Sequence, residues 1–143
     1  MFEDHVHAFA VRQTLYLFRP IVARVIDRFI GAEFAGLVSN DDALAARLLQ
    51  ASKDSGDAIW RMPLAEGYRQ KMKSVYADLK NSGGREGGSL TAAAFLERFV
   101  DGIPWAHVDI PGVAWTDRTS GTFSKGATGF GVRLVTRLLE TWR

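Results

Sequence analysis

The sequence predicts a layered α/β fold in which helices cover a β-sheet. Short apolar runs with strand character alternate along the chain with longer segments whose apolar residues recur at helical spacing, and this alternation is typical of such folds. The chain has 143 residues, of which 47% are hydrophobic. It is therefore long enough for one ordinary globular domain, and neither an internal repeat nor a linker suggests a second one.

The composition excludes several classes of function. Eighteen basic and sixteen acidic residues give a formal net charge of +2, which is too small to attract nucleic acid or a membrane surface. Without any cysteine, disulfides and thiolate metal sites are impossible, and a reducing cytosol suits the chain. The N-terminus lacks the pattern of a secretory signal, and charged residues interrupt its apolar run at residues 15–30. We expect a cytoplasmic protein that binds neither nucleic acid nor membranes.

The first half of the chain predicts two helices around one strand. Ile21–Ile30 has apolar residues at helical spacing, whereas Leu15–Phe18 fits a strand or a helix equally well. Phe34–Val38 predicts a buried strand, and Ser39–Asp42 predicts a capping box at the start of the next helix. Gly56 is placed to end that helix in the left-handed conformation. The apolar stripe of the helix is formed by Leu44, Leu48 and Leu49.

An extended segment and a further helix follow. Ile59–Met62 is predicted to be extended because Pro63 disfavours helix in the residue before it. A second amphipathic helix is then expected to end near Asn81. Its apolar positions are Tyr68, Met72, Val75, Tyr76 and Leu79.

The remaining segments complete the alternation. After a glycine-rich loop at Ser82–Gly88, Leu90–Val100 predicts a core helix because it is apolar on nearly every side. Trp105–Ile110 predicts a strand, and Trp115–Ala127 a long polar loop. Val132–Trp142 predicts a closing helix. Its inward positions are expected to be Val132, Val135, Leu139 and Trp142.

Three stretches of the chain resemble the cytosol (leucyl) aminopeptidase family, specifically the C-terminal portion of its catalytic domain. Their order and spacing fit together over roughly four-fifths of the chain, which makes coincidence improbable although each motif alone is weak. The first comprises Ala35–Asp42 and Trp60–Leu64, the second Ala77–Arg85 with Gly88–Ala93, and the third Trp105–Ile110, Ala114–Trp115 and Gly126–Arg133.

The resemblance implies a partial three-layer sandwich with a mixed sheet, taken from a hexameric enzyme that removes N-terminal residues from peptides. Such enzymes use two zinc or manganese ions, which bind the substrate amine and carbonyl and lower the pKa of a bridging water. In the family the metal ligands lie upstream of the matched region, and this chain contains none of them. We therefore assign no catalytic residue and no metal ligand.

The resemblance divides the chain at about residue 30. Residues 1–30 do not match the family, whereas residues 31–143 match its C-terminal part. This abrupt departure suggests a truncated or frame-shifted gene, or a chimeric start.

The resemblance also carries over three substrate-pocket positions. Ser82 corresponds to the pocket for the side chain beyond the cleaved bond, and Pro111 and Ala114 to the pocket for the N-terminal side chain. Pro111 replaces the alanine usual in the family.

Two pairs of residues, each with a histidine, could be metal ligands. His5 and His7 would share a face in an extended segment, but a frayed terminus is the preferred interpretation. His107 and Asp109 share a strand face, and a hydrogen-bonded core histidine is preferred there.

Three further features have a structural and a functional interpretation. Gly83, Gly84 and Arg85 could cradle an anion, but a tight loop that requires positive φ is preferred. Asp41–Asp42 is interpreted as a helix cap. Gly126–Gly131 is interpreted as a turn in which glycine allows backbones to approach closely.

Three functional hypotheses follow. The leading one is an aminopeptidase fragment that contributes pocket walls and assembly surface and is inactive alone. The alternative is an interaction module that co-assembles with intact aminopeptidase subunits, because half a layered domain exposes apolar surface. The third is an anion-binding domain built on the loop that contains Arg85.

Overall fold

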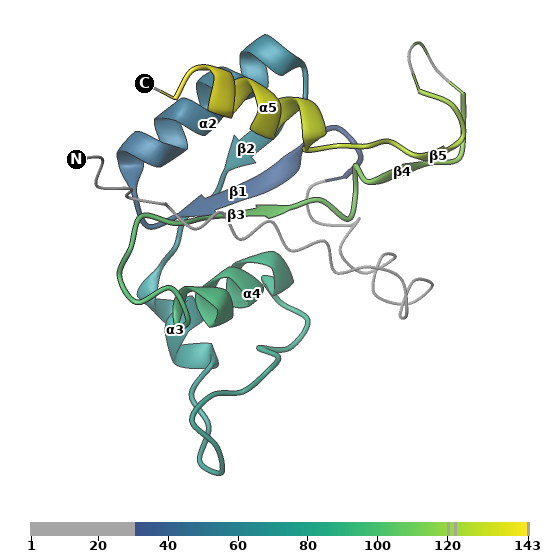
Figure 1. Ribbon diagram of the computed structural model, residues 1–143. Coiled ribbons are helices and arrows are strands. Elements are labelled where there is room, and N and C mark those ends of the chain that lie inside the picture. Colours follow the sequence, from purple (N-terminus) through teal and green to yellow (C-terminus); the bar gives the residue numbers. More distant parts are fainter. Residues whose placement is uncertain (1–30, 120, 122, 143) are drawn as a thin grey trace, which may run out of the picture.

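The computed structural model describes residues 31–119, 121 and 123–142. Figure 1 shows three layers, with helices α2 and α5 on one face of a sheet and helices α3 and α4 on the other. The expected helix at Ile21–Ile30, the ambiguous segment Leu15–Phe18 and the pair His5 and His7 lie outside the described residues.

The sheet confirms the predicted fold class. Strand β1 (Ala35–Ser39) lies between β2 (Ile59–Arg61), to which it is parallel, and β3 (Ala106–Asp109), to which it is antiparallel. All five residues of β1 are buried, because helices cover both faces of this central strand. The sheet is therefore mixed and covered by helices, and the three strands lie where the sequence predicts them to within two residues.

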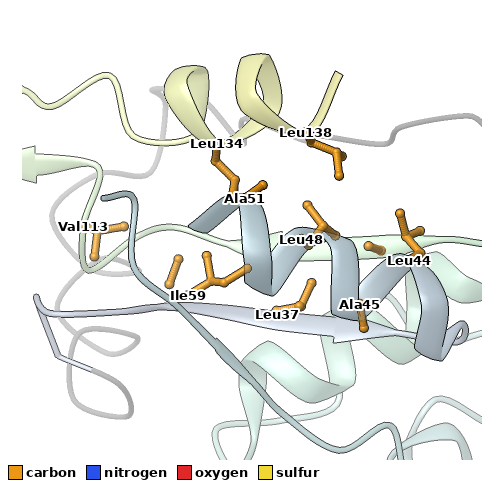
Figure 2. Packing of buried hydrophobic residues seen from close by; sticks show 11 residues of the cluster. Leu37, Leu44, Ala45, Leu48, Ala51, Ile59, Val113, Leu134 and Leu138 are labelled. Atoms are coloured by element: carbon orange, nitrogen blue, oxygen red, sulfur yellow. The ribbon is translucent and has the colours of Figure 1, made fainter. Parts of the chain in front are cut away.

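Helices α2 (Asp42–Ser55) and α5 (Val132–Glu140) form the main core with the upper face of the sheet. Gly56 ends α2 with a φ of 77°, as predicted. Figure 2 shows leucines of α5 pointing toward α2, and residues of α2 pointing toward the sheet. The buried cluster consists of Ala35, Leu37, Leu44, Ala45, Leu48, Ala51, Ile59, Ala106, Val113, Leu134 and Leu138.

The N-terminus of α2 is capped differently from the prediction. The capping residue is Asp41, whose Oδ1 accepts a hydrogen bond from Leu44 N at 2.6 Å. Ser39 Oγ instead donates to Trp105 O at 2.6 Å and so ties the end of β1 to the chain entering β3. Asp42 forms an ion pair with Arg61. The predicted capping box is wrong because its serine belongs to the strand, and the interpretation as a helix cap is confirmed for Asp41 but not for Asp42.

The buried face of α5 also differs from the prediction. Leu134 and Leu138 are buried against α2, whereas Val132 and Leu139 are exposed. The helix carries two apolar stripes, and the sequence offered no reason to prefer one. Leu134 and Leu138 lie one above the other on one helix face, and packing of that face against α2 selects it over the other stripe.

The second helical layer is shorter than predicted. Helix α3 (Glu66–Lys71) ends ten residues before Asn81, and residues 73–87 form a long loop. Ser74 Oγ accepts hydrogen bonds from the backbone N–H groups of Tyr76 and Ala77, both at 3.2 Å. Such local bonds compete with helical ones. The expected continuous helix to Asn81 is therefore wrong.

Helix α4 (Gly88–Glu97) covers the lower face of the sheet. Its Ala93 packs with Val38 of β1 and with Trp105, which immediately precedes β3. The small side chain of Ala93 allows the helix to approach the sheet closely. The predicted core helix is thus confirmed, although α4 ends three residues before Val100.

The segment predicted as one long polar loop contains a short pair of strands at its two ends. Strands β4 (Trp115–Thr116) and β5 (Gly126–Ala127) pair antiparallel to each other. Thr128 Oγ1 donates a hydrogen bond to Val113 O at 2.7 Å. The base of the loop is therefore held against the turn that follows β3.

Candidate functional site

Ser82, the first pocket candidate, lies in the loop that leads into α4. Its side chain is exposed, and its Oγ accepts a hydrogen bond from Gly84 N at 3.4 Å. Gly84 and Gly87 have φ values of 91° and 64°, a region that glycine adopts at little cost. These angles confirm the preferred interpretation of the glycine-rich segment as a loop that requires positive φ.

Close packing against α4 fixes the path of this loop. A Cβ atom on Gly83 would lie 2.6 Å from Thr91 Cγ2, which is shorter than any ordinary contact between carbon atoms. Only a glycine lets the backbone lie this close to the first turns of α4. The packing therefore determines where the neighbouring Ser82 is presented.

Pro111 and Ala114 share the turn that follows β3. The N–H groups of Val113 and Ala114 both donate to Ile110 O, at 3.1 and 2.9 Å. Val113 is buried in the main core, while the two pocket candidates are half-buried. The turn is therefore anchored to the main core through Val113. The structure brings Pro111 and Ala114 into one turn, and Ser82 belongs to a separate loop on the α3 and α4 side.

His107 is buried on β3 and stacks on Trp105, with ring centroids 6.2 Å apart. Among the described residues, neither of its ring nitrogens has a hydrogen-bond partner. The expectation of a hydrogen-bonded core histidine is therefore wrong in that detail. Burial lowers the pKa of His107, and the carboxylate of Asp109 opposes this shift. The ring is held in its neutral form because a charge would be desolvated there.

The residues present do not fit a dinuclear metal site. Among the residues that the structure describes, no three side chains of His, Cys, Asp or Glu are grouped closely enough to hold a metal ion. His107 and Asp109 form a pair without a third ligand, whereas hard divalent ions require several converging oxygen atoms. Asp57, the most deeply buried carboxylate of the core, is already bonded to Arg133. We therefore derive no step of a reaction through a metal ion.

Asp57 has the burial and charge typical of a functional residue, but the sequence did not reveal it. Its Oδ2 accepts hydrogen bonds from Gly131 N and Leu134 N at 3.0 and 3.2 Å, and its Oδ1 accepts one from Arg133 Nε at 3.1 Å. A carboxylate here interacts favourably with the N-terminal amides of α5. Its partners lie 74 to 77 residues away, so no local pattern could identify it. The role of Asp57 is structural.

The glycines before α5 have a different purpose from the one expected. Gly126, Gly129 and Gly131 have φ values of 136°, 68° and 93°. A Cβ atom added to any of them would meet no described atom within 4 Å. Positive φ, rather than close approach of backbones, therefore explains why glycine occupies these positions.

The described part of the chain contains no helix with the length and apolarity needed to cross a membrane.

Comparison with known proteins adds a family assignment. A model described as the cytosol aminopeptidase family, catalytic domain, matches residues 23–136.

Two curated relatives are each named probable cytosol aminopeptidase. The protein from Synechococcus sp. (strain JA-2-3B'a(2-13)) is 54% identical over 106 residues, which cover 74% of this chain and 21% of the relative. The protein from Trichormus variabilis (strain ATCC 29413 / PCC 7937) is 55% identical over 106 residues, covering 74% of this chain and 22% of the relative. The chain thus spans about a fifth of the length of these relatives.

Two solved structures share the fold. A tomato leucine aminopeptidase mutant superposes with a TM-score of 0.73 at 38% identity, covering 80% of this chain and 22% of that one. The bottromycin maturation enzyme BotP in complex with Mn gives a TM-score of 0.75 at 36% identity, covering 80% of this chain and 26% of that one. The motifs, the mixed sheet and these matches agree, and the chain belongs to the cytosol aminopeptidase family.

Proposed function

We propose that this chain supplies the C-terminal part of the catalytic domain of a cytoplasmic, hexameric aminopeptidase that removes leucine and similar N-terminal residues from peptides. The observation that carries the proposal is the match to the family's catalytic domain over residues 23–136. The likeness to a leucine aminopeptidase supports the substrate class. The likeness to a manganese-bound enzyme supports a divalent metal, zinc or manganese, in the complete site.

In this proposal the chain contributes walls of the substrate pocket. Pro111 and Ala114 line the pocket for the N-terminal side chain from one anchored turn, and Ser82 lines the pocket beyond the cleaved bond. A proline ring restricts its own backbone and fills more space than a methyl group. In an intact family member that has the usual alanine at this position, introducing proline should therefore raise KM for leucine substrates more than it lowers kcat.

The metal ligands are proposed to come from outside these 143 residues, because the acidic side chains of the described core are engaged in ion pairs or lack further ligands. The isolated chain should accordingly bind neither zinc nor manganese stoichiometrically and should not hydrolyse leucine amide. The test is elemental analysis of the purified chain together with a hydrolysis assay, with the Synechococcus relative as the positive control. Stoichiometric metal with robust turnover would refute the proposal.

The alternative function is an interaction module that co-assembles with intact aminopeptidase subunits. It is motivated by large apolar side chains that the described part of the chain leaves exposed, among them Trp60, Phe99 and Val132, since such surfaces seek partners. Mixing the chain with the intact Synechococcus relative and separating the products by native mass spectrometry would test it. Mixed hexamers support the alternative, and exclusive self-aggregation of the chain contradicts it.

A further inference from the structure

The turn after β3, which carries Pro111 and Ala114, uses its last two N–H groups internally. Val113 N and Ala114 N both donate to Ile110 O, at 3.1 and 2.9 Å, and Pro111 has no backbone N–H to donate. The buried side chain of Val113 anchors the turn to the main core. The orientation of its far end, at Ala114, therefore depends on the hydrogen bonds that the carbonyls of Val113 and Ala114 accept.

Thr128 donates to both of these carbonyls. Its Oγ1 donates to Val113 O at 2.7 Å, and its backbone N donates to Ala114 O at 3.1 Å. The same hydroxyl accepts a hydrogen bond from Phe130 N at 3.2 Å, so it acts as donor and acceptor at once. Because peptide groups are planar, these bonds hold the planes on both sides of Ala114 in one orientation.

Thr128 is itself supported from the side of α5. Phe130, two residues later, packs against the main core, and Gly131 N donates to Asp57 Oδ2 at 3.0 Å. Asp57 is 1% exposed. Thr128 thus connects a segment fixed to the core with the turn after β3. A residue supported in this way holds a pocket wall more precisely than a residue in an unsupported loop.

The pairing of β4 with β5 does not replace this connection. Its register begins with Trp115 opposite Ala127, so Ala114 lies outside the ladder. In Figure 1 the two strands extend away from the three-stranded sheet. Strands of two residues each form a pair with little stability of its own. The position of Ala114 therefore depends on Thr128 more than on the strands.

We propose that Thr128 is a positioning residue that determines where Ala114 lies in the pocket for the N-terminal side chain of the substrate. This inference rests on the proposed function, which assigns the pocket to an aminopeptidase. A wall that moves away by about 0.5–1 Å loses about a quarter to a half of its dispersion attraction for the side chain it meets. Loss of the Thr128 hydroxyl should therefore weaken the binding of substrates with a large aliphatic N-terminal residue such as leucine.

Amide hydrogen exchange of the full chain, followed by NMR, is the first test. Thr128→Val keeps the shape of the side chain and removes the hydroxyl, so the N–H of Ala114 should exchange about tenfold faster. Thr128→Ser keeps a hydroxyl and should bring the rate back to within about twofold of wild type. Thr116→Val is the matched control. Thr116 Oγ1 also donates to a carbonyl and accepts an N–H, but both belong to Arg118 in the polar loop.

Faster exchange at Ala114 in Thr128→Val alone supports the proposal. Unchanged exchange there, an equal increase in Thr116→Val, or no rescue by Thr128→Ser overturns it. The amides of β1 report opening of the core. Their acceleration to the same extent would also overturn the proposal, because the hydroxyl would then stabilise the whole fold and not the turn in particular.

An intact family member with threonine and alanine at the positions of Thr128 and Ala114 tests the effect on substrate. Valine in place of its threonine should raise KM for leucine amide about tenfold and change kcat by less than about twofold, because the wall contacts the side chain before the reaction begins. Glycine amide, which has no side chain to meet the wall, should keep its KM. An unchanged KM for leucine amide, or an equal rise for glycine amide, contradicts the proposal.

Enlarging the pocket alanine of the same enzyme to valine separates this inference from the proposed function. If KM for leucine amide changes in that variant but not in the threonine variant, the role of Thr128 is refuted and the pocket assignment stands. If KM does not change in the alanine variant, the pocket assignment itself is wrong, and the role of Thr128 in substrate binding is refuted with it.

Discussion

Asp57 and Arg133 form an ion pair that joins the segment between α2 and β2 to the first turn of α5. Asp57 lies between α2 and β2 and is 1% exposed, and its Oδ1 accepts a hydrogen bond from Arg133 Nε at 3.1 Å. The other carboxylate oxygen accepts the N–H groups of Gly131 and Leu134 at the start of α5. One buried side chain thus fixes both the position of the last helix and the conformation of its first turn.

Replacing Asp57 by asparagine should lower the free energy of unfolding by about 2–4 kcal/mol, because the buried network loses its negative charge and one of its two acceptor oxygens. Urea denaturation at neutral pH measures the change. Asp54→Asn is the matched control, since Asp54 binds Arg137 of the same helix at the surface and exposed pairs contribute little. Equal effects of the two substitutions would contradict the role assigned to Asp57.

Truncation of two neighbouring residues of α5 should have very different effects on the unfolding free energy, because one faces the core and the other is exposed. Leu138 is buried at 1% exposure and Leu139 is 60% exposed. Leu138→Ala should cost about 2–5 kcal/mol of unfolding free energy, whereas Leu139→Ala should change it by less than about 0.5 kcal/mol. Thermal and urea unfolding of both variants check this. A larger loss of unfolding free energy for Leu139→Ala than for Leu138→Ala would mean that Leu139 faces the core, as expected from the sequence.

The loop that presents Ser82 should tolerate no side chain at Gly83. Gly83→Ala forces a methyl group against Thr91 and should destabilise the protein by about 1–3 kcal/mol, the range for overpacking. Gly88→Ala serves as the control, because Gly88 is helical and no described atom lies within 4 Å of its added Cβ. That substitution should raise stability by about 0.5–1 kcal/mol. Identical effects on the melting temperature would refute the close packing.

Stability should decrease as the pH is lowered because of His107. Its pKa is lowered by burial in the folded state, so the unfolded chain binds the proton more readily. The stabilising contribution of neutral His107 is complete above the unfolded pKa of about 6.5 and is lost as pH decreases below it toward the folded pKa. The unfolding free energy attributable to His107 should therefore be lower at about pH 5.5 than at about pH 7.5.

The variant His107→Leu isolates this contribution. Among the described residues its ring nitrogens have no partner, so an apolar side chain of similar size should preserve stability at about pH 7.5. The difference in unfolding free energy between wild type and variant is measured by urea titration at several pH values. A difference that does not depend on pH would show that His107 does not cause the acid sensitivity.

Local signals in the sequence were sufficient for the strands and for α2. The apolar run that became β1 and the glycine that ends α2 act within a few residues, which is the range over which backbone propensity and burial patterns operate. The family resemblance likewise depended on linear motifs. The candidate pocket could be reached only through that resemblance, because Ser82 and Pro111 belong to different loops whose positions depend on contacts with α4 and with the core.

The sequence by itself determined the three strands of the main sheet, the helices α2, α4 and α5, the family, and the absence of thiol chemistry, because each depends on residue identity at short range. The tertiary structure decided which apolar stripe of α5 is buried, where α3 ends, that Asp41 rather than Ser39 caps α2, and that Asp57 anchors Arg133. Periodicity gives the spacing of apolar side chains, but only packing against a neighbouring element selects one face when a helix offers two. Hydrogen bonds between residues as far apart in sequence as Asp57 and Gly131 exist only once the chain has folded.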